Sequence, residues 1–150
     1  MQDRKPGDQA GKPLAGRNIR LTVAFDGTAY HGWQIQKNLR TVQGTLTHAL
    51  SRITGERIAL TGCGRTDAGT HARAFVANFH TGSRLSPDRI ARALNSLLPP
   101  DIRILSARVA PPEFHARKCA ISKTYRYQIC LGPIMPPHLS HEYFHYPFAV

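Results

Sequence analysis

The sequence predicts an α+β fold, a ferredoxin-like split β-α-β-β-α-β antiparallel sheet with an added strand. Three observations predict it. Short segments alternate apolar and polar residues with the period of two that strands require. Two other segments repeat apolar residues at helical spacing and have start and stop signals at their ends. These patterns follow one another as strand, helix, strand, strand, helix, strand, strand. In this arrangement two helices cover one face of the sheet and leave the other face bare.

The first strand and first helix have the clearest patterns. Residues 18–26 alternate, and the turn Asp26-Gly27-Thr28 ends the strand and opens a loop. Thr41 is a good N-cap for the helix that follows, and Gly55 is a good terminator. The expected inward residues are Ile19, Leu21, Val23 and Phe25 of the strand and Val42, Leu46, Ala49, Leu50 and Ile53 of the helix.

The later elements follow from the same signals. Strands are expected from about residue 57 to 63 and through Phe75, Ala77 and Phe79. Ser86-Pro87-Asp88 supplies a cap, a proline at the first helical position and an acid in the first turn. Residues 102–109 are expected to form the fourth strand, and 123–130 the fifth. The second helix should bury Ile90, Ala93, Leu94, Leu97 and Leu98 before it stops at Pro99 and Pro100.

Composition limits the function. The chain has 150 residues and a formal charge of +11, and fifteen of its twenty basic residues are arginine. An arginine-rich excess favours a nucleic-acid partner, and the alternative is a basic protein without a polyanion partner. No apolar stretch is long enough to span a bilayer, and the start has no apolar signal region. We expect a flexible basic leader over residues 1–17 and one half-domain over 18–150.

Cysteine and histidine patterns do not predict a metal site or a disulfide framework. Cys63, Cys119 and Cys130 are odd in number and widely spaced, which is typical of a reduced, cytoplasmic protein. His138, His141 and His145 have a spacing that could seat a metal on a helix. The prolines around them argue against a long helix there, and a metal-binding domain is kept as an alternative.

One segment has the composition of a catalytic loop. Residues 62–74 contain three glycines in eight residues and one carboxylate, Asp67, between Arg65 and Arg73. Glycines let the backbone turn sharply beside a ligand, and neighbouring positive charge favours an ionised carboxylate that can act as nucleophile or base. The alternative is structural, because aspartate commonly caps its own turn in a glycine-rich loop.

The motif Gly-Arg-Thr-Asp-Ala-Gly-Thr-His-Ala at residues 64–72 closely resembles the active-site segment of the TruA family, tRNA pseudouridine synthase I. One departure is Thr70, where the family usually has valine. The resemblance extends to 25–36, 41–46, 114–117 and 123–127, which are similar to the family's opening loop, first-helix entry and later strand.

The resemblance implies that the chain forms half of a pseudouridine synthase fold. Enzymes of this family isomerise uridines on the 3′ side of the tRNA anticodon arm and need no cofactor. Asp67 takes the place of the catalytic aspartate, attacking sugar or base or removing a ribose proton. Arg65 would orient it and occupy the space of the flipped-out nucleotide. Tyr125 would stack on uracil; the alternative is a core tyrosine. Expected phosphate contacts are Arg20, Arg73, Arg117, Lys118, Lys123 and Arg126.

The resemblance also implies a partner half. Family members have a second half of comparable size, which completes the cleft and forms much of a homodimer contact. We therefore expect the 150-residue chain to be inactive or weak alone, either as a shortened form of a synthase or as a short protein completed by a partner. A non-catalytic RNA-binding module of the same fold is the alternative function, in which Asp67 is only a turn residue. Tyr30 and Trp33 could be packing residues or RNA contacts.

Overall fold

The computed structural model describes residues 16–148, and the expected leader lies mostly outside these residues. The described chain forms two compact units that divide between Cys119 and Ala120, and each is treated by itself. The first unit contains the predicted β-α-β-β-α-β order. Its elements are β1 (Arg17–Phe25), α1 (Val42–Thr54), β2 (Thr61–Gly62), β3 (Ala72–Thr81), α2 (Pro87–Leu97) and β4 (Ile102–Ala110). The ferredoxin-like prediction is confirmed.

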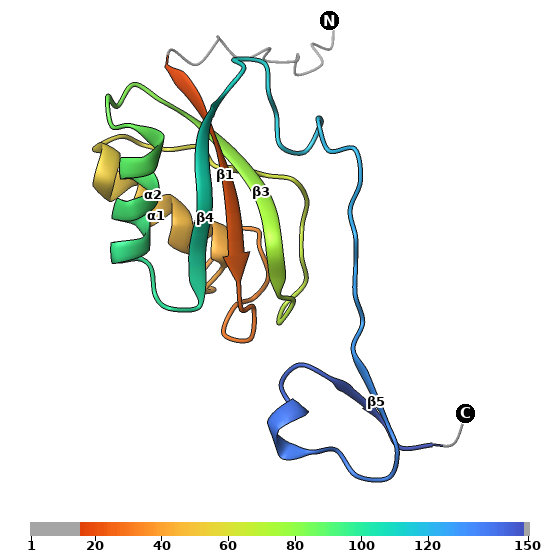
Figure 1. The fold of residues 1–150 in the computed structure, drawn as a ribbon. Coiled ribbons are helices and arrows are strands. Elements are labelled where there is room, and N and C mark those ends of the chain that lie inside the picture. The colour runs from red at the N-terminus through yellow and green to blue at the C-terminus, as the bar shows by residue number, and fades with distance from the viewer. Residues whose placement is uncertain (1–15, 149–150) are drawn as a thin grey trace, which may run out of the picture. The chain divides into compact units, whose positions relative to one another are not determined.

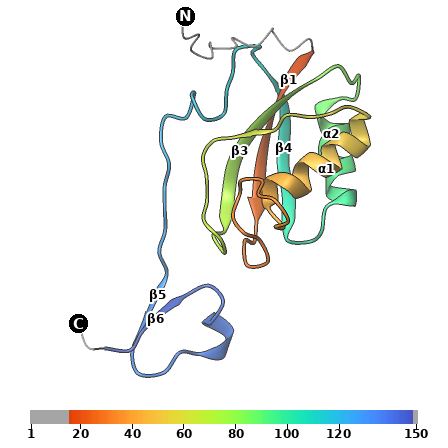
Figure 2. The ribbon, with the colours of Figure 1, turned by 180° about the vertical axis from the view of Figure 1, so that it is seen from behind.

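The four strands form an antiparallel sheet in the order β2-β3-β1-β4. Figures 1 and 2 show α1 and α2 together on one face of this sheet, with the opposite face free of helices. β1 is therefore a central strand, hydrogen-bonded to β3 on one side and β4 on the other. Its register with β4 shifts between Thr22 and Val23, and its register with β3 shifts between Val23 and Phe25.

The core lies between the helices and the sheet. The alternating residues predicted to face inward on β1 are all buried, which confirms that part of the prediction. They meet the α1 residues Val42, Leu46 and Leu50, which have no exposed surface. Ile90 and Leu94 provide the buried part of α2. Removing this apolar surface from water is what holds the helices against the strands.

The helix ends form as the sequence predicts. The Thr41 hydroxyl accepts a hydrogen bond from the backbone N–H of Gly44, and Gly55 ends α1 with φ of 72°. Ser86 caps α2 by accepting from the N–H of Arg89, and Pro87 occupies the first turn. Two residues of the predicted stripe differ: Leu97, the last residue of α2, is exposed and Ala93 is only half-buried, whereas Leu98 is buried as predicted.

Two strands are much shorter than predicted. The predicted strand 57–63 forms a ladder only at Thr61–Gly62, although Ile58 and Leu60 are buried. Side chains bond backbone groups on either side of the short ladder. Gln43 donates from Nε2 to the carbonyl of Leu60, and the Glu56 carboxylate accepts from the backbone N–H of Gly82, just after β3. The alternating pattern at 57–63 therefore predicted which residues are buried, but not which residues pair with another strand.

The second unit contains β5 (Ile129–Leu131), the short 3-10 helix η1 (Pro137–Leu139) and β6 (Phe144–Tyr146), with β5 and β6 paired in parallel. The strand predicted over 123–130 was therefore wrong in extent. Residues 123–128 pair with no strand within the described chain, and alternating side chains alone do not make a ladder.

The described residues contain no cluster of three potential metal ligands among histidine, cysteine and carboxylate side chains. Of the tail histidines, His138 lies in η1 and His145 bonds the carbonyl of Gly132 from Nε2 at 2.9 Å. In residues 16–148 no helix has the length and apolar character needed to cross a membrane.

Candidate active site

The candidate site is built where two loops meet beside the sheet, residues 26–41 after β1 and residues 63–71 before β3. Two glycines allow the backbones of the two loops to come close together. A Cβ on Gly27 would lie 2.0 Å from the carbonyl oxygen of Thr70, and one on Gly32 would lie 2.3 Å from that of Thr66. Gly32 also has φ of +79°, which side-chain-bearing residues rarely adopt. The backbone contacts therefore fix one loop against the other.

Backbone hydrogen bonds continue this junction. The N–H of Trp33 donates to the Thr66 carbonyl at 3.2 Å, and that of Gly69 donates to the Tyr30 carbonyl at 3.2 Å. Trp33 is 2% exposed and its ring lies 4.2 Å from that of Phe75 on β3. Trp33 is thus a packing residue beneath the loops, which resolves one alternative left open by the sequence.

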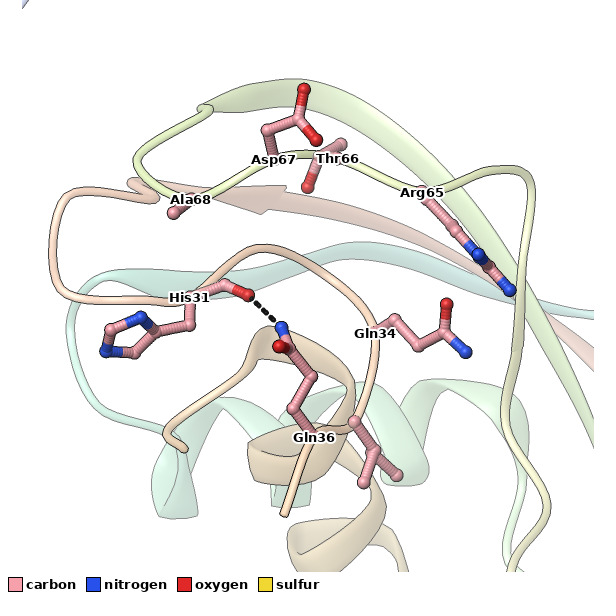
Figure 3. A pocket seen from close by; sticks show the side chains of 8 residues that line it. His31, Gln34, Gln36, Arg65, Thr66, Asp67 and Ala68 are labelled. Atoms are coloured by element: carbon pink, nitrogen blue, oxygen red, sulfur yellow. Dashed lines mark hydrogen bonds between the residues drawn. The ribbon is translucent and has the colours of Figure 1, made fainter. Parts of the chain in front are cut away.

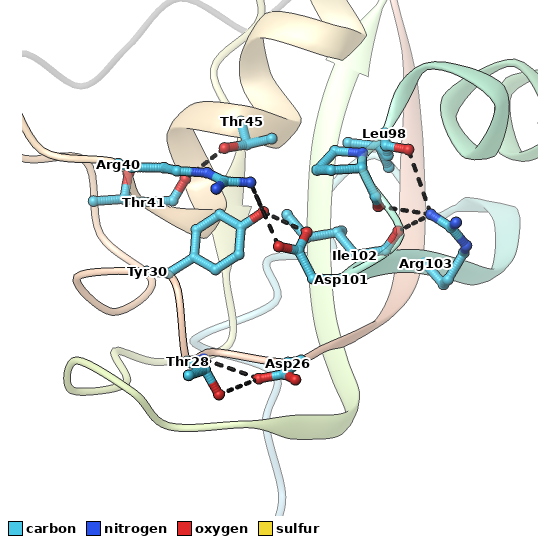
Figure 4. A network of polar contacts seen from close by, with 11 residues as sticks. Asp26, Thr28, Tyr30, Arg40, Thr41, Thr45, Leu98, Asp101, Ile102 and Arg103 are labelled. Atoms are coloured by element: carbon cyan, nitrogen blue, oxygen red, sulfur yellow. Dashed lines mark hydrogen bonds and ion pairs between the residues drawn. The ribbon is translucent and has the colours of Figure 1, made fainter. Parts of the chain in front are cut away.

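Tyr30 is also a packing residue, and it fixes the first loop to the start of β4 (Figure 4). Its hydroxyl donates to Oδ1 of Asp101 at 2.6 Å and accepts from Nη2 of Arg40 at 2.9 Å. The Arg40 guanidinium also lies 4.5 Å from the centre of the tyrosine ring. Burial, followed by the bond to Asp101, raises the pKa of Tyr30 to about 12. The hydroxyl therefore stays protonated and structural at neutral pH.

Asp26 closes the turn at the end of β1. Its Oδ1 accepts from the backbone N–H of Thr28 at 2.9 Å and from the Thr28 hydroxyl at 2.6 Å. These bonds, the side-chain one first, lower the pKa of Asp26 below its ordinary value. His71 lies on the other side, with Nδ1 3.0 Å from Oδ1 of Asp26 and accepting from the N–H of Gly27 at 3.2 Å. His71 thus contributes to the loop junction.

A cavity of about 370 Å³ opens between the two loops, within the size range of sites for small ligands. Figure 3 shows the polar side chains around it, with the Gln36 amide fixed by a 2.8 Å bond to the carbonyl of His31. The lining residues are His31, Gln34, Ile35, Gln36, Arg65, Thr66, Asp67 and Ala68. Amides, a guanidinium and a carboxylate at one opening suit a hydrogen-bonding ligand such as a nucleobase.

Asp67 lies exposed at this opening. Within residues 16–148 its carboxylate accepts no hydrogen bond and forms no ion pair, so it does not cap its own turn as the structural alternative required. The turn is closed instead by the backbone, the N–H of Thr70 donating to the Asp67 carbonyl. In Figure 3 the Arg65 and Asp67 side chains leave the loop in different directions. Both nevertheless line the same cavity.

The expected phosphate contacts lie on several surfaces of the chain. Arg20 lies on β1 with its guanidinium carbon 6.0 Å from the centre of the Phe114 ring, and Arg73 is exposed near the start of β3. Arg117 and Lys118 are exposed in the segment after β4. That segment is anchored by buried amides of Asn18 and Asn78, which bond the Phe114 carbonyl and the Ala116 N–H. The remaining two, Lys123 and Arg126, are exposed in the second unit.

Tyr125 also lies in the second unit, and its side chain is 63% exposed. It is therefore not buried within the second unit. Its neighbours on the same alternating face, Tyr127 and Ile129, are exposed as well. The role of Tyr125 in stacking on a base remains a prediction.

One basic residue with a defined environment was missed by the sequence reading. Arg108 on β4 is the direct cross-strand partner of Arg20 on β1. Alternation along β4 could have placed Arg108 on a face, but only the strand register shows that the two arginines stand opposite each other. The bulge between Thr22 and Val23 further shifts that register and leaves no sequence signal.

A ferredoxin-like sheet with one bare face, and a polar cavity lined by both Asp67 and Arg65, are features compatible with a protein that binds nucleotides. Comparison with known proteins narrows that class. Residues 21–117 match the sequence profile of the tRNA pseudouridine synthase family. The chain belongs to this family.

Curated relatives agree over most of the chain. It is 52% identical over 117 residues to tRNA pseudouridine synthase A of Ruminiclostridium cellulolyticum, covering 78% of this chain and 48% of that protein. It is 47% identical over 134 residues to tRNA pseudouridine synthase A of Caldicellulosiruptor bescii, covering 89% and 55%. The match to tRNA pseudouridine synthase A 1 of Desulfotalea psychrophila is 48% over 121 residues, covering 81% and 48%. The chain thus spans about half the length of these relatives.

Proposed function

We propose that this chain supplies the catalytic-loop half of a tRNA pseudouridine synthase that isomerises uridine in the anticodon arm to pseudouridine. The observation that carries the proposal is the state of Asp67, an exposed carboxylate without hydrogen bond or ion pair at the opening of a polar cavity. Family membership supports the reaction class. The isomerisation breaks the N1–C1′ bond, joins C1′ to C5 and moves one proton from C5 to N1, so atoms balance without a co-reactant.

Residue roles follow from this reaction. Asp67 is the proposed catalytic residue, because a carboxylate free of internal partners can bond to the substrate or take its proton. Arg65 lines the same cavity and is proposed to bind the flipped nucleotide, and Tyr125 to stack on the uracil. The six basic residues Arg20, Arg73, Arg117, Lys118, Lys123 and Arg126 are proposed to contact phosphates, which makes binding salt-dependent.

The proposal extends to the assembled enzyme. We expect a second half resembling the unmatched part of the relatives to complete the site, the full-length form to be a homodimer, and the protein to act in the cytoplasm. The three free cysteines support a reducing location.

Pseudouridine formation on an anticodon stem-loop RNA tests the proposal. The 150-residue chain would be assayed alone and fused to the segment of the Ruminiclostridium cellulolyticum relative that it does not match. We expect little product alone, product from the fusion, and none from the fusion carrying Asp67→Ala. A fusion that binds RNA in a salt-dependent way but gives no product, with or without Asp67, would instead indicate a binding module. Product from the Asp67→Ala fusion would refute the catalytic assignment.

A further inference from the structure

A second, smaller cavity lies on the bare face of the sheet, outside the loops that carry Asp67. It has a volume of about 190 Å³ and is lined by Arg20 and Thr22 of β1 and by Ser106 and Arg108 of β4. No residue of the 63–71 loop takes part. Its lining is two guanidinium groups and two hydroxyl groups, without a carboxylate.

The four side chains are brought together by strand pairing. Arg20 pairs directly with Arg108, and Thr22 pairs directly with Ser106. Between the paired residues, Leu21 and Ala107 are buried. Because side chains alternate across a strand, the two arginines and the two hydroxyl residues share the opposite, helix-free face. The hydroxyl residues are half-buried and the arginines are exposed, so hydroxyls lie deeper than the charges.

The pairing is electrostatically unfavourable without a counter-charge. Like charges directly opposite each other destabilise an antiparallel pair. Within the described residues neither Arg20 nor Arg108 forms an ion pair, since the ion pairs there are Arg40–Asp101 and His71–Asp26. Arg20 is held instead beside the ring of Phe114, in the segment after β4. The arrangement therefore places two positive charges beside two hydroxyl groups, with no acidic group lining the cavity.

The geometry points to an anion site, and we propose that Arg20, Thr22, Ser106 and Arg108 together bind one phosphodiester group of the RNA. Guanidinium groups grip phosphate oxygens at two points and hydroxyl groups donate to them, so all four members have the right chemistry. The inference rests on the proposed function for the identity of the RNA. It adds a phosphate-binding position on the sheet face, where Arg108, Thr22 and Ser106 join Arg20 as proposed phosphate contacts.

The test is binding of an anticodon stem-loop RNA to the 150-residue chain, measured by fluorescence anisotropy between roughly 50 and 200 mM salt. The variant Arg20→Gln/Arg108→Gln removes the site. The variant Arg52→Gln/Arg89→Gln removes the same charge from exposed positions on α1 and α2 and is the matched control. We expect about a tenfold or greater loss of affinity for the first variant. Its salt slope should fall by about 0.7–0.9, the value for one phosphate contact, while the control keeps the wild-type slope.

Two further measurements keep the outcome clear. Arg108→Glu replaces the repulsive pair with an attractive one, so its melting temperature should equal or exceed that of the wild type while RNA affinity falls. Equal slopes and affinities for the two double variants would overturn the proposal. A free-phosphate site would also overturn the proposal. In that case inorganic phosphate at matched ionic strength would raise the melting temperature of the wild type but not of Arg20→Gln/Arg108→Gln, while the two proteins would bind RNA equally. The readout needs no turnover, so absence of pseudouridine would refute the proposed reaction but not this site.

Discussion

Two aspartates at the two loops of the site, Asp26 and Asp67, have opposite environments. The Asp26 carboxylate accepts two hydrogen bonds from Thr28 and lies 3.0 Å from a histidine nitrogen. The Asp67 carboxylate has no such partner in the described part of the chain, and the residue lines a cavity. Both carboxylates are followed by a glycine within two residues, so local sequence does not separate them. A carboxylate with its acceptor sites filled builds a turn, whereas one with free acceptor sites remains available to a substrate.

The largest expected effect is on catalysis at Asp67. Asp67→Asn keeps the size of the side chain and removes its charge and basicity. In the fused, active form we expect kcat to fall roughly 10³-fold or more, because a group that bonds to the substrate or takes its proton is lost. Asp26→Asn is the matched control and should keep most activity. Equal losses in both variants would mean that the two carboxylates share a structural role.

The second expected effect concerns the junction between the loops. Gly32→Ala forces a Cβ against the Thr66 carbonyl at a residue with positive φ, whereas Gly55→Ala meets nothing within 4 Å at a similar φ of +72°. We expect a cost of roughly 2–3 kcal/mol at Gly32 and about 1 kcal/mol at Gly55, measured by urea unfolding. The difference isolates the contact that holds the Asp67 loop. Equal costs would show that the junction can relax.

The third effect tests the hydroxyl that fixes the first loop. Tyr30→Phe removes the bonds to Asp101 and from Arg40 and should cost about 1–2 kcal/mol near neutral pH. The folded-state pKa of Tyr30 is raised from 10.0 to about 12, so its contribution is present below pH 10 and is lost as pH rises towards 12. The difference in unfolding free energy between wild type and variant should therefore shrink across that window. A constant difference would contradict the pKa shift.

The fold was largely predictable because its signals are local. Caps at Thr41 and Ser86, the terminator Gly55 and the alternation of β1 depend on a few neighbouring residues, and all are observed. Strand length was not predictable at 57–63 or 123–130, since a ladder depends on a partner that alternation does not specify. The motif at 64–72 marked the Asp67 loop, but the burial of Tyr30 and Trp33 and the pairing of Arg20 with Arg108 required the tertiary structure.

The smallest effect is expected at Asp26 and completes the comparison. Asp26→Asn keeps an oxygen that Thr28 can still bond, so we expect a loss of less than about 1 kcal/mol at neutral pH. Hydrogen bonds from Thr28 lower the folded-state pKa of Asp26 below the ordinary value of 3.8. The ionised carboxylate therefore stabilises the fold at pH values above 3.8, and this stabilisation is lost as pH falls through the lowered pKa. Acid unfolding of the wild type should therefore include a component that Asp26→Asn lacks, measured by urea unfolding from pH 6 down to about pH 3. An acid component that persists unchanged in Asp26→Asn would contradict the assignment of the lowered pKa to the Thr28 hydrogen bonds.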